Sequence, residues 1–408
     1  MCTIEIRGKI PLAGTVEVSG SKNAALPMVF ASIITKGVSV LRRTPKITDI
    51  DKSLEILKAL GAVVYRREDT VYIDTRTLTP AEIEEGLLRS IRASTYLLGS
   101  MLSRFGECRI SSFGGCGFSS RPIDMHIAAL EAFGGRVDGD IIRADGLRGT
   151  ILRFNKQSVG ATINSIILAS SAEGESEIYG YAKEPHVLAL IDFLKSAGAQ
   201  IAVDDEKISV RGKELHGGDI TVIGDMIEAG TYLSAGLATG GRVGTSGCEP
   251  RELSAFLDTI EKMGARVWER DGVIFAEQTG RLKTCSVICE AYPGFPTDLQ
   301  PICGALMSTM LGGIIIDRVW PERYGYLDSL SPLGLKHRRL CSGVEILPSD
   351  LIGSTVTATD LRGGAAAVIC ALAAEGKSTV CSAEHILRGY ENIDGKLRSL
   401  GADVALEM

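Results

Sequence analysis

A glycine-rich loop holds the cysteine with the most distinctive surroundings in this chain of 408 residues. Gly114 and Gly115 precede Cys116, Gly117 follows it, and Arg121 lies five residues after the cysteine. Flanking glycines let backbone N–H groups approach an anion, and a nearby guanidinium favours the thiolate form of a cysteine. The pattern fits a reactive thiol beside an anion site, and it equally fits a surface turn around an inert cysteine.

Cationic side chains form the second group that could carry chemistry. We expect Ser21 to cap a helix whose first turn carries Lys22 and Asn23. A lysine there opposes the helix dipole, so Lys22 is either a solvated side chain or a ligand of an anion such as phosphate. Four further arginines have apolar neighbours: Arg92, Arg323, Arg362 and Arg388. They could form structural ion pairs, with Asp360 or Glu391 as partners, or converge on an oxyanion.

A proline-rich segment places one carboxylate. Residues 292–298 contain two prolines and a glycine and end at Asp298. A general base must be held in position before its protonation state matters, and such a segment could hold one. We also expect Asp298 to cap a helix that begins at Leu299.

Composition and motifs exclude several classes of protein. With 45% hydrophobic and 23% charged residues the chain is globular, and its formal charge of −6 disfavours a nucleic-acid or anionic-membrane surface. The P-loop, the dinucleotide fingerprint and zinc-protease motifs are absent from the sequence, and Cys285 and Cys289 have no nearby histidine. We therefore expect no metal and no cofactor.

The ten cysteines are scattered, and the N-terminal segment lacks the apolar stretch of a signal peptide. The longest uncharged stretch, 299–316, contains Gln, Pro and Gly residues, which disfavours a membrane span. These features predict a cytoplasmic protein with reduced thiols.

A repeat of roughly 68 residues organises the chain. Six amphipathic helical segments end at glycines 61, 134, 198, 264, 334 and 401, and six segments rich in small residues end at glycines 37, 106, 174, 240, 312 and 376. Within each series the spacing is 64 to 73 residues. Two markers with one period predict six units that each contain two helices and several strands.

The second helix type fixes the expected architecture. Residues 365–374 are apolar on all sides, so this helix must be buried, with the helices inside and the sheets outside. Alternation over 265–270, followed by Asp271-Gly272, predicts a hairpin. Counting predicts two domains of three units, residues 22–226 and residues 1–21 with 227–408, with the strand 3–6 joining the later half.

The motifs, taken in order, resemble those of the UDP-N-acetylglucosamine 1-carboxyvinyltransferase family of enolpyruvyl transferases. The matching segments are SGSKNAALP (19–27), RSIRAS (89–94), GGCGFSSRPIDMH (114–126), SVGAT (158–162), AKEP (182–185), GFPTDLQ (294–300), ATDLR (358–362) and RGYE (388–391). They span nearly the whole chain. The cysteine loop followed by Arg-Pro-x-Asp-x-His distinguishes this family from the shikimate-pathway enolpyruvyl transferases, which share the fold.

The resemblance implies a two-domain inside-out α/β barrel whose domains close over phosphoenolpyruvate and UDP-N-acetylglucosamine. The enolpyruvyl group would pass to the sugar 3-hydroxyl and phosphate would leave, by addition and then elimination through a tetrahedral ketal. This reaction is the first committed step of peptidoglycan precursor synthesis.

The resemblance also implies roles for single residues. Lys22, Arg121 and Arg388 would hold the phosphate, and Arg323 and Arg362 would lie beside the carboxylate of phosphoenolpyruvate. Cys116 would act as general acid at the methylene carbon, form a covalent adduct and react with fosfomycin, while Asp298 would act as base. The residues implied to hold the nucleotide sugar are Asn23, Arg92, Arg121, Pro122, Ile123, Asp124, Met125, Lys156, Gln157, Ser158, Val159 and Val319.

The chain departs from the family pattern at a few positions. These are Ser21, Gln157, Met226, Leu335 and Leu387. They leave open an enolpyruvyl transferase for another nucleotide or sugar acceptor, and a catalytically weak regulatory paralog. Loss of Cys116, Lys22 or Asp298 would favour a regulatory protein, and all three are present.

Overall fold

The computed structural model describes residues 2–110 and 123–408, which form two compact units. Unit 1 consists of residues 2–19 and 224–408, and unit 2 consists of residues 20–110 and 123–223. In the described chain, the crossings between the units follow Ser19 and Ile223. Each unit has its own buried hydrophobic core.

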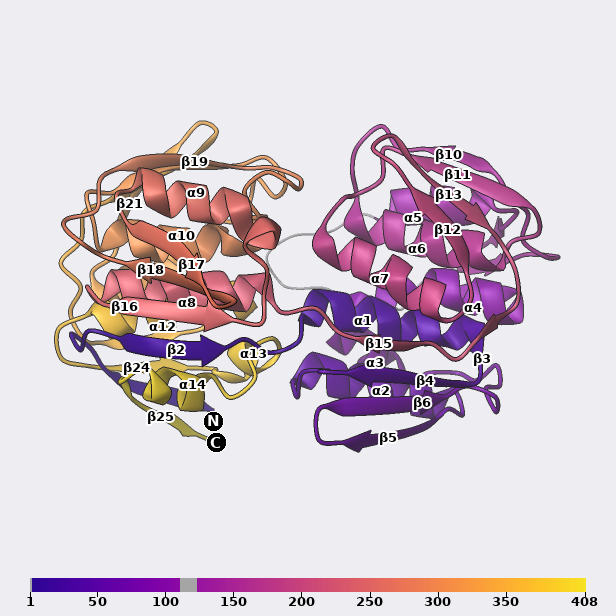
Figure 1. Ribbon diagram of the computed structural model, residues 1–408, viewed down its shortest axis with the longest axis horizontal. Helices are drawn as coiled ribbons and strands as arrows, with labels where there is room; N and C mark the ends of the chain where they lie inside the picture. The colour runs from indigo at the N-terminus through magenta and orange to yellow at the C-terminus, as the bar shows by residue number, and fades with distance from the viewer. Residues whose placement is uncertain (1, 111–122) are drawn as a thin grey trace. The chain divides into compact units, whose positions relative to one another are not determined.

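Unit 1 contains three four-stranded sheets (Figure 1). Their strands, in sheet order, are β17 (Arg266–Arg270), β18 (Val273–Glu277), β16 (Arg242–Ser246) and β2 (Ala13–Glu17); β19 (Cys285–Cys289), β20 (Gly313–Asp317), β22 (Gly343–Leu347) and β21 (Lys336–Leu340); and β23 (Thr355–Thr357), β24 (Lys377–Cys381), β1 (Thr3–Arg7) and β25 (Asp403–Glu407). The inner helices are α8 (Met226–Ala238), α10 (Gln300–Ser308) and α12 (Leu361–Ala373). The other helices are α9 (Ser254–Lys262), α11 (Tyr326–Leu330), α13 (Glu384–Leu387) and α14 (Ile393–Ser399), with the 3₁₀ turns η3 (Pro250–Leu253), η4 (Thr297–Leu299) and η5 (Ser331–Leu333).

Unit 2 is built in the same way, although one of its sheets has three described strands. The sheets are β15 (Asp219–Thr221), β4 (Val38–Arg42), β6 (Thr70–Asp74) and β5 (Val63–Arg67); β10 (Ile151–Arg153), β11 (Glu175–Tyr179), β13 (Lys207–Arg211) and β12 (Gln200–Val203); β7 (Glu107–Arg109), β9 (Ile141–Arg143) and β8 (Arg136–Asp138); and the pair β14 (Leu215–His216) and β3 (Thr35–Lys36). The inner helices are α1 (Lys22–Ala31), α4 (Leu97–Phe105) and α6 (Val159–Ser171). The remaining helices are α2 (Thr48–Ala59), α3 (Glu85–Ser90), α5 (Asp124–Ala132) and α7 (Pro185–Ser196), with η1 (Ser32–Ile34) and η2 (Arg92–Tyr96).

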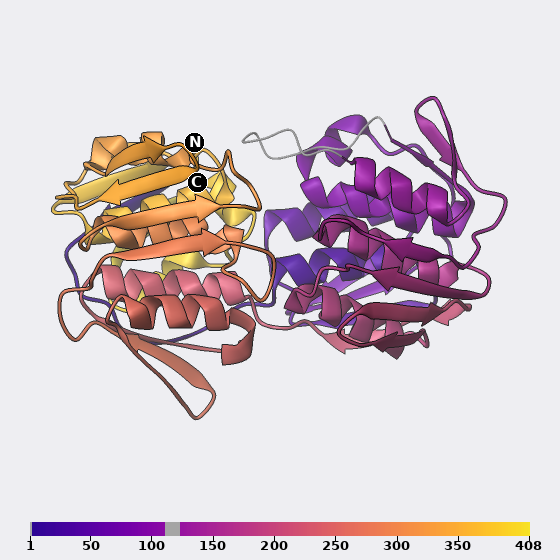
Figure 2. The same ribbon diagram turned by 90° about the horizontal axis from the view of Figure 1, so that it is seen from above.

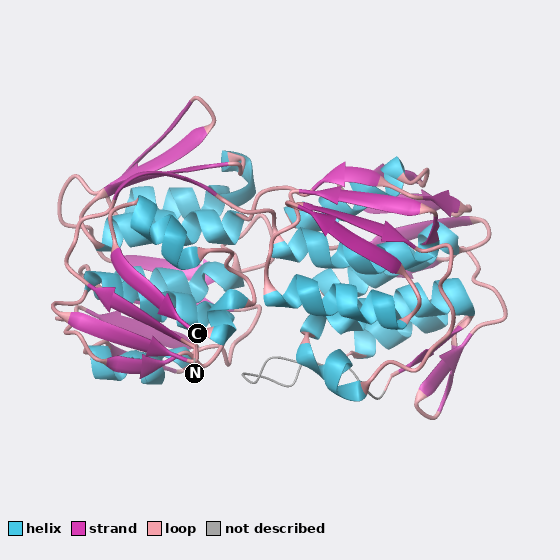
Figure 3. Ribbon diagram, turned by 90° about the horizontal axis from the view of Figure 1, so that it is seen from below, coloured by secondary structure: helices cyan, strands magenta, loops and turns pink. Residues whose placement is uncertain are grey.

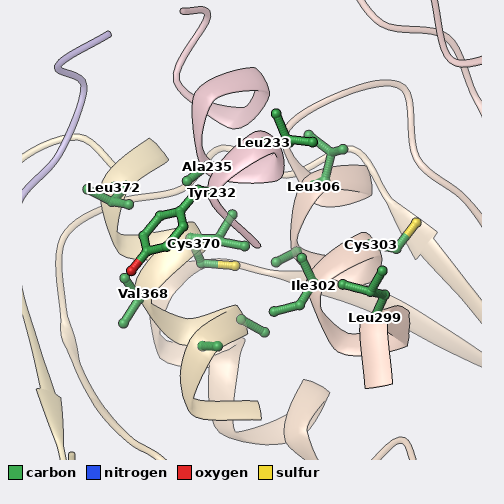
Figure 4. Packing of buried hydrophobic residues seen from close by; sticks show 14 of the residues in the cluster. Tyr232, Leu233, Ala235, Leu299, Ile302, Cys303, Leu306, Val368, Cys370 and Leu372 are labelled. Carbon is green, nitrogen blue, oxygen red and sulfur yellow. The ribbon is translucent and has the colours of Figure 1, made fainter. Parts of the chain in front are cut away.

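The inner helices confirm that helices lie inside and sheets outside within each unit (Figure 3). Every residue of α12 is buried. Helices α8 and α10 pack against α12, and the packed side chains include Leu233 of α8, Ile302 of α10 and Val368 of α12 (Figure 4). A glycine on α12 also allows the close approach of α13. A methyl group added at Gly364 would lie 2.7 Å from Ile386 Cγ1, so the Ile386 side chain would have to shift to admit it.

The repeat glycines also behave as predicted. In the first series φ lies between +89° and +103°, the left-handed conformation that ends a helix, and all six of the second series have positive φ as well. Asp271 and Gly272, with φ of +53° and +72°, join β17 to β18, which confirms the predicted hairpin.

The first strand closes unit 1. Strand β1 pairs antiparallel with both β24 and β25, so the first strand joins the later half of the chain, as the sequence predicts. The N- and C-terminal segments therefore lie side by side (Figure 2). Among the described residues, none of the helices is long and apolar enough to cross a bilayer.

Candidate active site

One carboxylate in unit 1 is shared by two buried guanidinium groups. Asp298 lies on η4, Arg323 follows strand β20, and Arg362 lies in the first turn of α12. Arg323 Nη1 is 2.8 Å from Asp298 Oδ1, and Arg362 Nη2 and Nε are 3.1 and 3.3 Å from Oδ2. The Arg323 and Arg362 side chains are 6% and 2% exposed, whereas the Asp298 side chain is 29% exposed.

This arrangement corrects two sequence predictions. Helix α10 begins at Gln300 with no side-chain cap, because the Asp298 carboxylate binds the two arginines instead. The carboxylate partner of Arg362 is therefore Asp298 and not Asp360 or Glu391. Asp360 caps α12 by accepting the backbone N–H groups of Arg362 and Gly363.

One donor nitrogen of the Arg362 guanidinium is not used by the described residues. Its Nη1 is buried and has no hydrogen-bond partner among the described residues. Burial is the largest single influence and opposes the charge, but Asp298, Tyr390 and Asp225 together outweigh it, so the pKa of Arg362 is raised. A charged donor without an acceptor is costly, and an anionic ligand oxygen would satisfy it.

Asp317 organises the neighbouring loop and was missed by the sequence analysis. It ends strand β20, accepts a 2.6 Å hydrogen bond from Thr297 Oγ1, and accepts the backbone N–H groups of Val319 and Trp320 at 2.9 and 2.8 Å. Burial raises its pKa, although these hydrogen bonds oppose the effect. The available signal was a single aspartate directly after the apolar run 314–316.

Unit 2 places Lys22 at the start of α1. Ser21 caps this helix by accepting the Ala24 N–H, which confirms the predicted cap. Lys22 Nζ lies 3.3 Å from Asp49 Oδ2, and both side chains are largely buried. Asp49 thus offsets part of the repulsion between the ammonium and the helix dipole, a partner that the sequence analysis did not identify.

A histidine network joins three other elements of unit 2. His126 Nδ1 lies 2.7 Å from Asn164 Nδ2, which also donates to the Thr95 carbonyl at 3.0 Å. An amide nitrogen only donates, so Nδ1 accepts and the ring proton is on Nε2. Burial, assisted by the charge of Arg92, lowers the pKa of His126 to about 4, so the ring is neutral.

The remaining predicted ligands fall near these elements or outside the description. Asn23 follows Lys22 on α1, Ile123 precedes α5, Asp124 and Met125 open α5, Ser158 caps α6, and Val159 is its first residue. Lys156 and Gln157 are exposed, and Gln157 Nε2 donates to the Tyr181 carbonyl. Arg388 follows α13 and is half-buried. Cys116, Arg121 and Pro122 lie outside the described residues.

Each unit therefore holds a group of predicted ligands. Unit 1 brings Asp298, Arg323 and Arg362 into contact and places Val319 on the Asp317 loop. In unit 2, η2 contacts both α1 and α6, so Lys22, Arg92 and Ser158 lie on packed elements.

A family model decides the classification. The model for EPSP synthase (3-phosphoshikimate 1-carboxyvinyltransferase) matches residues 6–397. This chain belongs to the EPSP synthase family. Its similarity to relatives extends over the whole length, so the family assignment applies to both units.

Several relatives of this EPSP synthase family member are named UDP-N-acetylglucosamine 1-carboxyvinyltransferase, some with a number after the name. The Clostridium botulinum protein is 39% identical (99% of each chain covered), the Caldanaerobacter subterraneus protein 41% (98% of each), and a Streptococcus agalactiae protein 38% (100% of this chain, 99% of the relative). The sequence resemblance to this family is thereby confirmed.

Solved structures confirm the two-domain α/β fold of the family. The enolpyruvyl transferase NikO from Streptomyces tendae matches with a TM-score of 0.88 at 24% identity, covering 100% of this chain and 99% of that one. EPSP synthase from Acinetobacter baumannii matches with a TM-score of 0.75 at 17% identity, covering both chains fully. Within residues 2–110 and 123–408, this family member has no group of three His, Cys, Asp or Glu side chains arranged to hold a metal ion.

Proposed function

We propose that this protein transfers the enolpyruvyl group of phosphoenolpyruvate to the 3-hydroxyl of UDP-N-acetylglucosamine and releases phosphate, in the cytoplasm, as the first committed step of peptidoglycan precursor synthesis. The observation that carries the proposal is the Asp298 carboxylate held by Arg323 and Arg362, with one buried Arg362 donor left without a partner. The names of full-length relatives at 38 to 41% identity support the choice of acceptor.

The cations divide between the two ends of phosphoenolpyruvate. Arg362 and Arg323 bind the carboxylate, because a guanidinium matches the two oxygens of such a group. Lys22, Arg388 and Arg121 bind the phosphate, which carries the larger charge.

Proton movements define the reaction. Asp298 accepts the proton of the acceptor hydroxyl as its oxygen bonds to C2 of the enol, while Cys116 donates a proton to the methylene carbon. This addition gives a tetrahedral ketal that bears a methyl group. The Cys116 thiolate then takes a proton back from the methyl group as the bond from C2 to the phosphate oxygen breaks, which restores the vinyl group. The departing phosphate takes the proton held by Asp298, so both residues return to their starting states.

The nucleotide sugar is bound mainly by unit 2. Arg92, residues 121–125 and residues 156–159, together with Asn23 and with Val319 of unit 1, form its binding set. Arg92 is a good candidate for the diphosphate, because burial lowers its pKa and bound phosphate would restore the stability of its charge.

Acceptor dependence tests the proposal. Purified protein mixed with phosphoenolpyruvate should release phosphate only when UDP-N-acetylglucosamine is added, and shikimate 3-phosphate should not replace it. Equal release without an acceptor, or no release at all, would reject the function. Turnover with another nucleotide sugar alone would favour the alternative acceptor, and tight nucleotide-sugar binding without turnover would favour the regulatory alternative.

Fosfomycin tests the predicted cysteine. Among the ten cysteines we expect the epoxide to modify Cys116, and a Cys116→Ser variant to remain unmodified and to lose turnover or stall at product release. Peptide mapping that placed the label on another cysteine would count against the assignment.

A further inference from the structure

We propose that Tyr390 is a positioning residue for the reaction, because its ring face holds the Arg362 guanidinium in the orientation that binds the carboxylate of phosphoenolpyruvate. The inference rests on the proposed function and assigns a role to a residue that touches no substrate. It starts from the fact that one carboxylate, Asp298, serves two buried guanidinium groups.

The Tyr390 ring lies next to the Arg362 guanidinium, whose positive charge is only partly compensated because Arg323 shares the Asp298 carboxylate. Arg362 Cζ is 5.5 Å from the centroid of the Tyr390 ring, and the two residues are 2% and 1% exposed. A guanidinium over an aromatic face is attracted by the negative potential of that face, most strongly where water is excluded. An aliphatic side chain of similar size would fill the volume without this attraction.

Tyr390 is itself held in place by α8. Its hydroxyl lies 2.8 Å from Thr231 Oγ1, and Thr231 Oγ1 lies 2.7 Å from the Ile227 carbonyl. The single hydroxyl proton of Thr231 goes to that carbonyl, so Tyr390 must donate to Thr231. The ring orientation is therefore set from a different helix than the one that carries Arg362.

The two contacts together account for the geometry of Arg362. Asp298 binds Nε and Nη2, Cζ of the guanidinium lies over the Tyr390 ring, and Nη1 has no hydrogen-bond partner in the described part of the chain. A guanidinium constrained along one edge and one face has little freedom left, so the remaining nitrogen is directed at a fixed point. That point is the expected position of one substrate oxygen.

An isosteric series at position 390 tests the inference. We expect Tyr390→Phe to lower kcat/KM for phosphoenolpyruvate by about threefold, because the ring face is retained while the hydroxyl bond to Thr231 that orients the ring is lost. The phenylalanine variant is the reference for the series. Replacing that phenylalanine by monofluoro- and then trifluorophenylalanine weakens the ring face without changing its shape. kcat/KM for phosphoenolpyruvate should fall stepwise to about tenfold below the phenylalanine variant, while KM for UDP-N-acetylglucosamine changes less than twofold.

A flat response to fluorination would overturn the inference, because a packing role depends only on shape. Equal losses for both substrates would also overturn it, since Arg362 would then not be the affected group. Circular dichroism and thermal unfolding of each variant show that comparisons are made between folded proteins. A wild type without acceptor-dependent turnover would reject the proposed function as well, whereas wild-type turnover with a flat series would reject this inference alone.

Discussion

At the residue scale, Asp298 is the shared counterion of two arginines and the base of the proposed mechanism. The two guanidinium groups stabilise its ionised form, which is the form that accepts a proton. The Asp298 side chain is 29% exposed, so the two arginines do not enclose it completely.

Asp298→Asn removes both roles, and a separate measurement reports on each. We expect kcat to fall about 10²- to 10⁴-fold, because the amide cannot accept the proton. The free energy of unfolding should also fall by about 3 kcal/mol or more, because two buried cations lose their counterion. Steady-state kinetics and urea unfolding measure both, and a kcat within tenfold of wild type would contradict the assignment of Asp298 as base.

His126 predicts a pH dependence of stability. Its pKa is lowered from 6.5 to about 4 on folding, so the unfolded state binds the proton more tightly. The contribution is complete above about pH 6.5 and is lost as the pH falls through about 4, a change of about 3 kcal/mol.

Denaturant unfolding at several pH values measures this effect. A His126→Gln variant should show a shallower loss of stability between pH 6.5 and 4 than wild type does. The control is His216→Gln, which alters an exposed histidine and should keep the wild-type slope. Equal slopes for wild type and His126→Gln would contradict the buried, neutral state of His126.

Residue types were predicted from the sequence more successfully than residue partners. The sequence identified Lys22, Arg323 and Arg362 as candidate ligands, but it did not reveal Asp49 as the partner of Lys22, and it gave no role to Tyr390 of the RGYE segment. A local pattern shows which residue can carry a charge. The counterion of that residue is distant in the sequence, and only the tertiary fold brings the two together. The predicted cap at Asp298 failed for the same reason, since tertiary partners displaced a local hydrogen bond.

At the element scale, a buried ion pair connects α14 to α8 and to Ser19, which follows strand β2. Lys396 Nζ donates to Glu228 Oε1 at 2.5 Å and to Ser19 Oγ at 2.6 Å, and Glu228 Oε2 accepts the Ser19 N–H at 2.7 Å. The Glu228 side chain is 1% exposed, and burial raises its pKa despite the ammonium beside it.

Lys396→Met should lower the free energy of unfolding by about 3 to 5 kcal/mol, because it leaves a buried carboxylate without its partner. Adding Glu228→Met should restore much of the loss, because both charges are then absent. Lys377→Met is the control: its pair with Glu5 is exposed, and such pairs contribute little. Chemical denaturation measures all three, and equal losses for Lys396→Met and Lys377→Met would contradict the ion-pair account.

Helices and hairpins were predictable because their signals are local. The repeat period, the glycine at the end of each helical segment and the apolar composition predicted the two helix types. The pair Asp271-Gly272 predicted the turn between β17 and β18. The parallel edge strands were not predictable. Strands β2, β10, β15, β19 and β23 pair with β16, β11, β4, β20 and β24 through long connections, and no short motif encodes that choice.

At the scale of the whole molecule, the described ligand set is divided between two units. Unit 1 contributes the base and the carboxylate-binding arginines of the proposed mechanism, and unit 2 contributes Lys22 and most of the nucleotide-sugar set. Neither set alone contains the parts that the transfer requires. The proposed reaction is therefore tested on the intact chain, in which both sets of residues are present.

Nuclear magnetic resonance of a single reaction mixture tests the proposed reaction most directly. With phosphoenolpyruvate and UDP-N-acetylglucosamine as reactants, we expect one phosphate per acceptor consumed and a vinyl ether at the sugar 3-oxygen, with the nucleotide intact. Phosphate that accumulates beside unmodified UDP-N-acetylglucosamine, or an enolpyruvyl group attached elsewhere, would contradict the account.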